Sequence, residues 1–318
     1  MTSSETTAGQ IPRKAKIRPL AIPAWFRNNP IILKEMQSRM RNWRSLGSLT
    51  GFIAVLSLVI GLIYTSLTEL STGVGIDVAN ELGRTIFFTV YGIELFVVCM
   101  VSPALTSGAI SGEKEQQTYD LLRTTLLSAR NLILGKLIAA ISFVLLFMVA
   151  TIPLQSIAFI FGGISLGEIV IAFVIMVLTA ITFGSIGIFY SSFISKTRVA
   201  TALSQITGIV FVIVIPVITL ITINAIDSQI NINKMSDLFQ VVFFTCLWLI
   251  CITGPAATAV LTEFFLTEQQ TLFYFTEQLS GGATILIPSP WLGFVILYPI
   301  LSLILLSFAI RFVQRAEK

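Results

Sequence analysis

Long apolar segments separated by short polar connections make up most of the chain from about residue 46 onward. A membrane-spanning helix needs about 20 predominantly apolar residues, because it rises about 1.5 Å per residue through a hydrocarbon core about 30 Å thick. Six segments approach or exceed that length, and each one predicts a membrane-spanning helix. They cover residues 46–67, 85–107, 137–161, 169–193, 200–225 and 291–310.

One further apolar block, residues 238–262, has a different pattern. Its part before the Gly254-Pro255 pair, Leu238 to Ile252, gives only about 22 Å of helix, which is too short to cross the bilayer. Glycine and proline together weaken and interrupt a helix. We therefore predict a re-entrant hairpin on the outer side of the membrane, with a seventh full span as the alternative.

The polar segment before the first span has the pattern of an amphipathic helix. Apolar side chains recur there at helical spacing after Pro30, which suits a first helical turn. We expect this helix to lie in the inner headgroup layer and to lead into the first span; the simpler alternative is a basic anchor without a further role. Its apolar positions are Ile32, Met36, Met40 and Trp43, and its charged positions include Lys34, Glu35, Arg39 and Arg41.

The connection between the second and third predicted spans, residues 108–136, contains seven charged residues: Glu113, Lys114, Glu115, Asp120, Arg123, Arg130 and Lys136. It opens with the polar stretch SGEKEQQT and continues with YDLLRTTLL, whose leucines suit a short amphipathic helix. Such a helix either docks into a protein or rests on lipid, and the pattern alone leaves both possibilities open. The helix covers residues Thr118, Tyr119, Asp120, Leu121, Leu122 and Arg123.

The composition agrees with a polytopic helical membrane protein. The 318 residues are 55% hydrophobic and 11% charged, and the mean hydropathy is +0.91. We expect an all-α fold with six transmembrane helices, the N-terminal amphipathic helix, the short helix of the 108–136 loop and the outer-side hairpin. The corresponding organisation is a cytoplasmic tail and amphipathic helix (1–45), a membrane domain (46–312) and a second tail (313–318). No signal-peptide pattern precedes the first span, so we expect that span to remain as an anchor.

Lys and Arg are distributed very unevenly between the two sets of connections. Nine precede the first span, four lie in the 108–136 loop, two lie between the fourth and fifth spans, and three follow the last span. The opposite connections contain only Arg84 and Lys234, together with nine acids. Because basic loops are retained inside, we predict that both termini and the 108–136 loop are cytoplasmic.

The reactive side chains argue against several classes of protein. The chain has three cysteines, all in apolar segments, and no histidine, so we expect no disulfide framework and no Cys/His metal site. The acids are dispersed rather than clustered as a Mg²⁺ enzyme would need. No G-x-x-x-x-G-K-[ST] phosphate loop occurs. We therefore expect no enzyme, no cofactor in this chain and no nucleic-acid partner.

Glu94 is the one charged residue well inside a predicted span. A buried charge in the membrane is costly and normally faces a bundle interior, a partner or water. Two interpretations follow: it lines a translocation path or dimer seam, or it is hydrogen-bonded to a neighbouring helix. The pairs Gly47/Gly51 and Gly184/Gly187 would permit close contact between helices, although such spacings are common.

Two stretches together resemble a known family. They are NPIILKEMQSRMR before the first span and SPALTSGAISGEKEQQTYDLLRTTLLSARNLILGKL after the second. They are similar to the N-terminal signature and the coupling loop of exporter-type ABC transporter permeases of the second class. The similarity covers residues 28–165 well, SSFISKTRVAT weakly and the remainder hardly at all.

The resemblance implies a permease in the inner (plasma) membrane of a prokaryote, with ATP and Mg²⁺ bound by separate ABC ATPase subunits. A second permease subunit would complete the path through the bilayer. Glu113 matches the Glu of the family's Ser-Gly-Glu motif, and Thr118 to Arg123 match its coupling helix. The alternatives are a noncatalytic anchor subunit of a larger complex and a secondary transporter, although the latter should show paired intramembrane charges or an inverted repeat.

Overall fold

The fold is described from a computed structural model. It covers residues 43–70, 76–117, 129–218, 252–260, 273–278 and 284–316, together with isolated positions at 221, between 241 and 249, and at 262. In chain order the elements are α3 (Trp43–Leu70), α4 (Ile76–Ser107), α5 (Ser111–Glu115), α7 (Ala129–Phe161), α8 (Leu166–Phe193), α9 (Thr197–Ile209), the π-helical turn η1 (Val210–Val214), β1 (Tyr274–Gln278), β2 (Thr284–Pro288) and α13 (Pro290–Ala316).

Six described helical segments are long and apolar enough to cross a membrane, which confirms the predicted all-α polytopic class. The prediction began the second span at residue 85, whereas α4 begins at Ile76. Its first turns contain polar residues such as Glu81 and Arg84, which lower the local hydropathy but do not interrupt the helix. The six segments are Ser45–Leu67, Val78–Glu115, Ala129–Phe161, Leu166–Phe193, Thr197–Ile218 and Pro290–Gln314.

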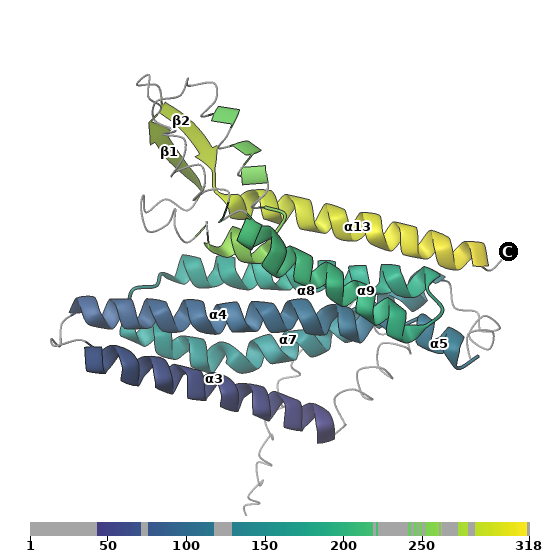
Figure 1. Ribbon diagram of the computed structural model, residues 1–318, viewed down its shortest axis with the longest axis horizontal. Coiled ribbons are helices and arrows are strands. Elements are labelled where there is room, and N and C mark those ends of the chain that lie inside the picture. The colour runs from purple at the N-terminus through teal and green to yellow at the C-terminus, as the bar shows by residue number, and fades with distance from the viewer. Residues whose placement is uncertain are drawn as a thin grey trace, which may run out of the picture.

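Helix α8 occupies the middle of the bundle. It packs most extensively against α4 and α13 and also contacts α7 and α9 (Figure 1). The largest core cluster is built from α4, α7, α8, η1 and α13. Its members include Tyr91, Leu95, Met148, Ile175, Phe183, Phe294 and Tyr298.

Two glycines allow the closest approaches between helices. A Cβ added to Gly187 of α8 would collide with the Thr106 side chain and the Pro103 carbonyl of α4. A Cβ added to Gly83 of α4 would collide with the carbonyl oxygens of Ala158 and Gly162. Because backbone atoms cannot move aside as side-chain tips can, both positions require glycine for this packing.

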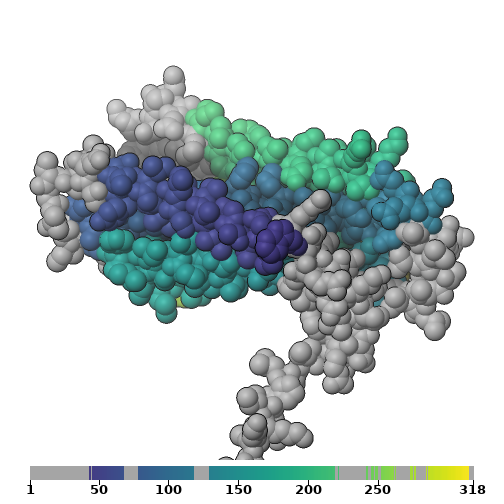
Figure 2. Space-filling view, turned by 90° about the horizontal axis from the view of Figure 1, so that it is seen from below, coloured from purple at the N-terminus to yellow at the C-terminus, as the bar shows by residue number. Residues whose placement is uncertain are grey.

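Helix α3 lies along the outside of the bundle (Figure 2). Leu56 and Ile60 on one face pack against α4 and the end of α7. Its other faces expose large apolar side chains, as expected for a helix in contact with lipid or with a second subunit. These are Leu46, Val55, Leu58, Leu62 and Tyr64.

A two-stranded antiparallel hairpin adds to the all-α prediction. Strands β1 and β2 pair from Tyr274 opposite Pro288 to Gln278 opposite Thr284, and they lie at the end of the bundle remote from α5 (Figure 1). Aromatic and β-branched residues favour such strands, but two short runs gave no clear signal beside the long apolar helices. Residues 255–260 are helical, whereas most of 238–251 lies outside the described residues, so the re-entrant hairpin stays a prediction.

Candidate functional site

The site predicted from the sequence begins where α4 ends. After Ser107 the chain makes a short turn and immediately forms α5, Ser111–Glu115. Gly108 leaves room for Thr197 at the start of α9, because a Cβ there would lie 3.3 Å from the Thr197 methyl. Gln117, with φ of 56°, ends this element in the left-handed region.

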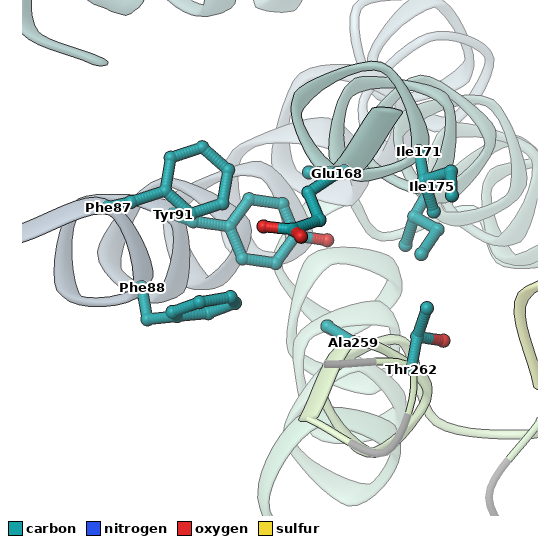
Figure 3. A pocket seen from close by; sticks show the side chains of 9 residues that line it. Phe87, Phe88, Tyr91, Glu168, Ile171, Ile175, Ala259 and Thr262 are labelled. Atoms are coloured by element: carbon teal, nitrogen blue, oxygen red, sulfur yellow. The ribbon is translucent and has the colours of Figure 1, made fainter. Parts of the chain in front are cut away.

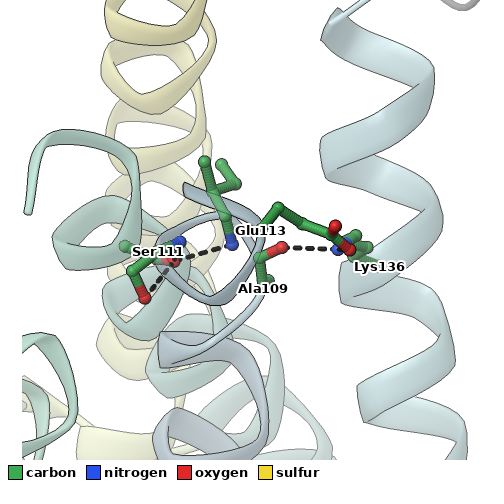
Figure 4. Close-up of polar contacts among 6 residues, drawn as sticks. Ala109, Ser111, Glu113 and Lys136 are labelled. Atoms are coloured by element: carbon green, nitrogen blue, oxygen red, sulfur yellow. Dashed lines mark hydrogen bonds and ion pairs between the residues drawn. The ribbon is translucent and has the colours of Figure 1, made fainter. Parts of the chain in front are cut away.

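Ser191 of α8 fixes the turn between α4 and α5. Its hydroxyl oxygen accepts hydrogen bonds from the backbone N–H groups of Ile110 and Ser111, each at 2.9 Å (Figure 4). The Ser111 hydroxyl in turn donates to the Ser107 carbonyl at 2.7 Å. All of these groups are buried, so satisfying them contributes more than a hydrogen bond at the surface would. The turn is therefore held against α8.

An ion pair joins α5 to α7. The Lys136 ammonium lies 3.0 Å from Glu113 Oε1 and also donates to the Ala109 carbonyl (Figure 4). The Lys136 side chain is only 9% exposed and that of Glu113 29%. A buried ammonium needs both a counter-charge and hydrogen-bond acceptors, and this site supplies both. Glu113, which the resemblance singled out, thus has a partner 23 positions further along the chain.

Two more contacts join α5 to the α8–α9 connection. The Lys114 ammonium donates to the Ser192 carbonyl at 2.7 Å, near the C-terminus of α8. The Thr197 backbone N–H donates to Glu115 Oε2 at 3.2 Å. A carboxylate at a helix N-terminus and an ammonium at a C-terminus both complement the helix dipole. The short helix α5 is therefore tied to α7, α8 and α9.

A recess of about 280 Å³ lies beside this cluster. One wall is formed by the Glu113–Lys136 pair, and the small residues of the α4–α5 turn form another. A volume of this size accommodates a side chain of a partner protein. Its lining consists of Leu105, Gly108, Ala109, Gly112, Glu113, Gln116 and Lys136.

Several predicted site residues lie outside the described residues. This holds for the whole coupling helix, residues 118–123, and for Lys34, Glu35, Arg39 and Arg41 of the N-terminal helix. Their roles stay predictions. The described residues that flank the coupling helix are Gln117 and Ala129.

Glu94 lies at a contact between α4 and α7. Its side chain is buried, with 2% of the residue exposed. One carboxylate oxygen accepts from the Thr151 hydroxyl at 2.7 Å and the other from the Gln155 amide at 2.8 Å. Thr151 and Gln155 are four residues apart and so share one face of α7. This geometry supports the interpretation as a hydrogen-bonded helix interface, while a role in a translocation path stays a prediction.

The sequence reasoning missed the partners that hold these charged groups. Ser191 and Ser192 stand in the apolar run IFYSSF, and Thr151 and Gln155 stand in an otherwise apolar span. Hydroxyl and amide side chains within an apolar span could have indicated these partners, because such groups in a membrane form hydrogen bonds with neighbouring helices. Among the described residues, no group of three or more His, Cys, Asp or Glu could hold a metal ion.

One comparison with known proteins identifies a family. The model of the ABC-2 family transporter protein matches residues 29–314, which is most of the chain. The match includes the predicted amphipathic helix, all six membrane helices and the α5 cluster. A comparison with curated proteins finds no match. The chain therefore belongs to the ABC-2 family of transporter membrane proteins.

Proposed function

We propose that this chain is the permease subunit of an ATP-driven exporter and that residues 118–123 couple it to an ABC ATPase. Two permease subunits and two ATPase subunits would form the working assembly, with ATP and Mg²⁺ bound by the ATPases. Family membership supports the permease role. The ATPase contact and the export direction are the parts that require experiment.

The observation that carries the coupling proposal is the attachment of α5. ATP-driven movement of a soluble subunit can reach membrane helices only through a stiff element joined to several of them. Helix α5 is joined to α7 through Lys136, to α8 through Ser191 and Ser192, and to α9 through Thr197. A displacement applied next to α5 would therefore act on three spans together.

The segment that includes the predicted coupling helix is anchored at both of its ends. Ile110 before it and Ala129 and Ile133 after it belong to one buried cluster. That cluster also contains residues of α8 and of the last turns of α13. A force on residues 118–128 would thus reach a packed core at both ends, as a coupling element requires and as a loop helix resting on lipid would not need.

The charges of this end of the molecule support the same assignment. Lys114, Lys136, Lys196 and Arg198 lie at the α5 end, and α13 also ends there with Arg311 nearby (Figure 1). Basic residues next to membrane spans are retained in the cytoplasm, where an ATPase would be. The recess beside Glu113 and Lys136 is where we expect a side chain of the ATPase to lie.

The decisive experiment changes Leu121→Asp together with Leu122→Asp. Each buried leucine contributes about 1.5–3 kcal/mol, and a buried unpaired carboxylate adds a further cost, so the ATPase should no longer bind or couple. Pulldown of the ATPase and substrate-stimulated ATP hydrolysis by the reconstituted complex measure the two effects. Membrane insertion should be unaffected, because added acidic residues have little effect on the orientation of the spans in the membrane.

The matched control is Thr124→Asp with Thr125→Asp, which adds the same charge three residues later, at polar positions outside the predicted coupling helix. It should leave both pulldown and hydrolysis close to wild type. Unchanged pulldown and hydrolysis in the double-leucine variant would refute the coupling helix and support a loop helix on lipid.

A further inference from the structure

A small pocket lies toward the opposite end of α8 from α5. It is formed between α4, the first turns of α8, the helical residues 255–260 and Thr262 (Figure 3). Its volume of about 20 Å³ is enough for one group the size of a water molecule. The lining residues are Phe87, Phe88, Tyr91, Glu168, Ile171, Ala172, Ile175, Ala259 and Thr262.

Two residues that line this pocket have a buried hydroxyl without a partner. The Tyr91 hydroxyl and the Thr262 Oγ1 form no hydrogen bond within the part of the chain that the structure describes. Each residue is only 3% exposed. An unsatisfied buried hydroxyl costs about 1–3 kcal/mol, so native proteins normally give it water or a ligand. The Thr262 oxygen points away from Glu168, whereas Tyr91 lies beside it, so the Tyr91 hydroxyl indicates that something polar occupies the pocket (Figure 3).

Glu168 supplies a carboxylate to the same pocket (Figure 3). It forms a capping box with Ser165, whose hydroxyl donates to Glu168 Oε1 at 3.1 Å. No cationic side chain pairs with it among the described residues. A carboxylate accepts about four hydrogen bonds, so the capping box leaves capacity unused. Its full negative charge also exceeds the partial positive charge of the α8 N-terminus.

Aromatic rings complete the lining. Phe87 and Phe88 meet edge to face with centroids 5.2 Å apart, and Phe87 stacks on Tyr91 at 6.1 Å. Ring faces attract cations, and the attraction is stronger where water is excluded. Side chains of a helix point toward its N-terminus, which directs Tyr91 toward the Glu168 end of the bundle. The pocket therefore combines a carboxylate, the Tyr91 hydroxyl and aromatic rings.

We propose that this pocket binds a primary ammonium group. The N–H bonds of such a group match two acceptors, namely the Glu168 carboxylate and the Tyr91 hydroxyl. An anion would be repelled by Glu168, and a purely apolar group would leave the Tyr91 hydroxyl unsatisfied. A water molecule has a suitable size but cannot neutralise the carboxylate. The proposal goes beyond coupling, since it assigns a ligand site at the other end of the same helix.

The position suggests two sources for the ammonium group. The charge distribution predicts that the start of α8 faces the outer side of the membrane. There the amine could belong to a lipid headgroup, such as phosphatidylethanolamine, or to a soluble amine. Both present the same chemistry to the pocket, so the experiment has to separate them.

The test uses the full chain in nanodiscs. Phosphatidylethanolamine is compared with phosphatidylcholine of identical acyl chains, whose quaternary ammonium has no N–H to donate. Native mass spectrometry measures lipid retention, and the thermal midpoint measures stabilisation, with and without free ethanolamine. The expected result is about tenfold stronger retention of the primary amine lipid together with a higher midpoint, since a hydrogen bond to a charged group has that order of effect.

Two variants and one matched control locate the effect. Glu168→Gln should abolish the preference. Tyr91→Phe should reduce it severalfold without lowering the midpoint in phosphatidylcholine, because it removes an unsatisfied hydroxyl. Ser165→Ala removes the capping hydroxyl but keeps the carboxylate, so its midpoint should fall while the preference remains.

Each possible result either supports or contradicts ammonium binding in this pocket. Stabilisation by free ethanolamine without a lipid preference supports the site with a soluble amine as its ligand. If neither the lipid nor ethanolamine stabilises the wild type, the pocket holds water only and the proposal is wrong. An unchanged preference in Tyr91→Phe would place the amine elsewhere, and this holds even if Glu168→Gln fails to fold.

Discussion

Helices α3 and α8 are both apolar and 28 residues long, yet they occupy opposite environments. Helix α8 is surrounded by α4, α7, α9 and α13, whereas α3, among the described elements, packs mainly against α4 and α7. Hydrophobicity therefore shows that both helices belong in a membrane but not which of them is central. The two helices differ in the contacts that their glycine and hydroxyl residues make.

The glycines make the comparison concrete. On α8, Gly184 and Gly187 face neighbouring helices closely enough that an added Cβ would touch or collide with them. On α3, no heavy atom of the described chain lies within 4 Å of a Cβ added to Gly47, Gly51 or Gly61. The glycine spacing permitted a close contact at both helices, and the described chain forms it only at α8. The α3 glycines would allow contacts with lipid or a second subunit.

The largest expected effect comes from filling the α8 contact. Gly187→Leu places a side chain against the Pro103 carbonyl and Thr106, and the backbones must separate. We expect a loss of about 3 kcal/mol or more in unfolding free energy, because overpacking against backbone cannot relax. Unfolding in detergent, followed by circular dichroism, measures it. Gly51→Leu on α3 is the matched control and should not lower the unfolding free energy, because nothing lies within 4 Å of a Cβ added there and leucine favours a helix over glycine. Equal losses of unfolding free energy in the two variants would show that Gly187 is packed no more tightly than Gly51.

A smaller effect is expected from Ser191→Ala. The substitution removes the acceptor shared by the N–H groups of Ile110 and Ser111, which costs about 2 kcal/mol for buried donors. Hydrogen exchange at these two amides should accelerate at least tenfold, and ATPase coupling should weaken. On α3 the Ser57 hydroxyl bonds only within its own helix, to the Ile53 carbonyl at 2.9 Å, so Ser57→Ala should change neither property. Unaltered exchange in Ser191→Ala would show that the α5 turn does not depend on α8.

The smallest effect concerns alanine in place of glycine. Gly51→Ala should stabilise the isolated chain by about 0.5–1 kcal/mol, because alanine favours the helix and meets no neighbour. At Gly184 the new Cβ would lie 3.0 Å from Leu137 Cδ1, so the gain should largely disappear. Native mass measurement sharpens the test: if a second subunit packs on α3 at Gly51, the alanine variant should dissociate more readily. A destabilised isolated chain would contradict the exposed position of α3.

Much of the fold could be predicted from the sequence. The six spans follow from hydropathy, since each segment either meets or fails the length requirement of the bilayer by itself. The α4–α5 region was correctly identified as unusual from its charges and from the resemblance of its motif. The start of α4 was misplaced because polar residues beyond the hydrocarbon core can continue a helix without any apolar signal.

The pairing of side chains could not be predicted in the same way. The sequence singled out Glu113 but did not identify Lys136, whose ammonium lies 3.0 Å from the Glu113 carboxylate in the structure. Charge alone does not distinguish one cation from another. Which cation pairs with Glu113 depends on how α7 is positioned beside the α4–α5 turn.

The sequence by itself determined the membrane class, the six apolar spans and the position of the charged 108–136 loop, because these depend on local hydropathy and charge. Only the tertiary structure decided that α8 is central, that Ser191 holds a turn about 80 positions away, and that Tyr91, Glu168 and Thr262 share one pocket. Each of these facts joins residues far apart in the chain. Their proximity is set by the packing of whole helices, which no single segment encodes.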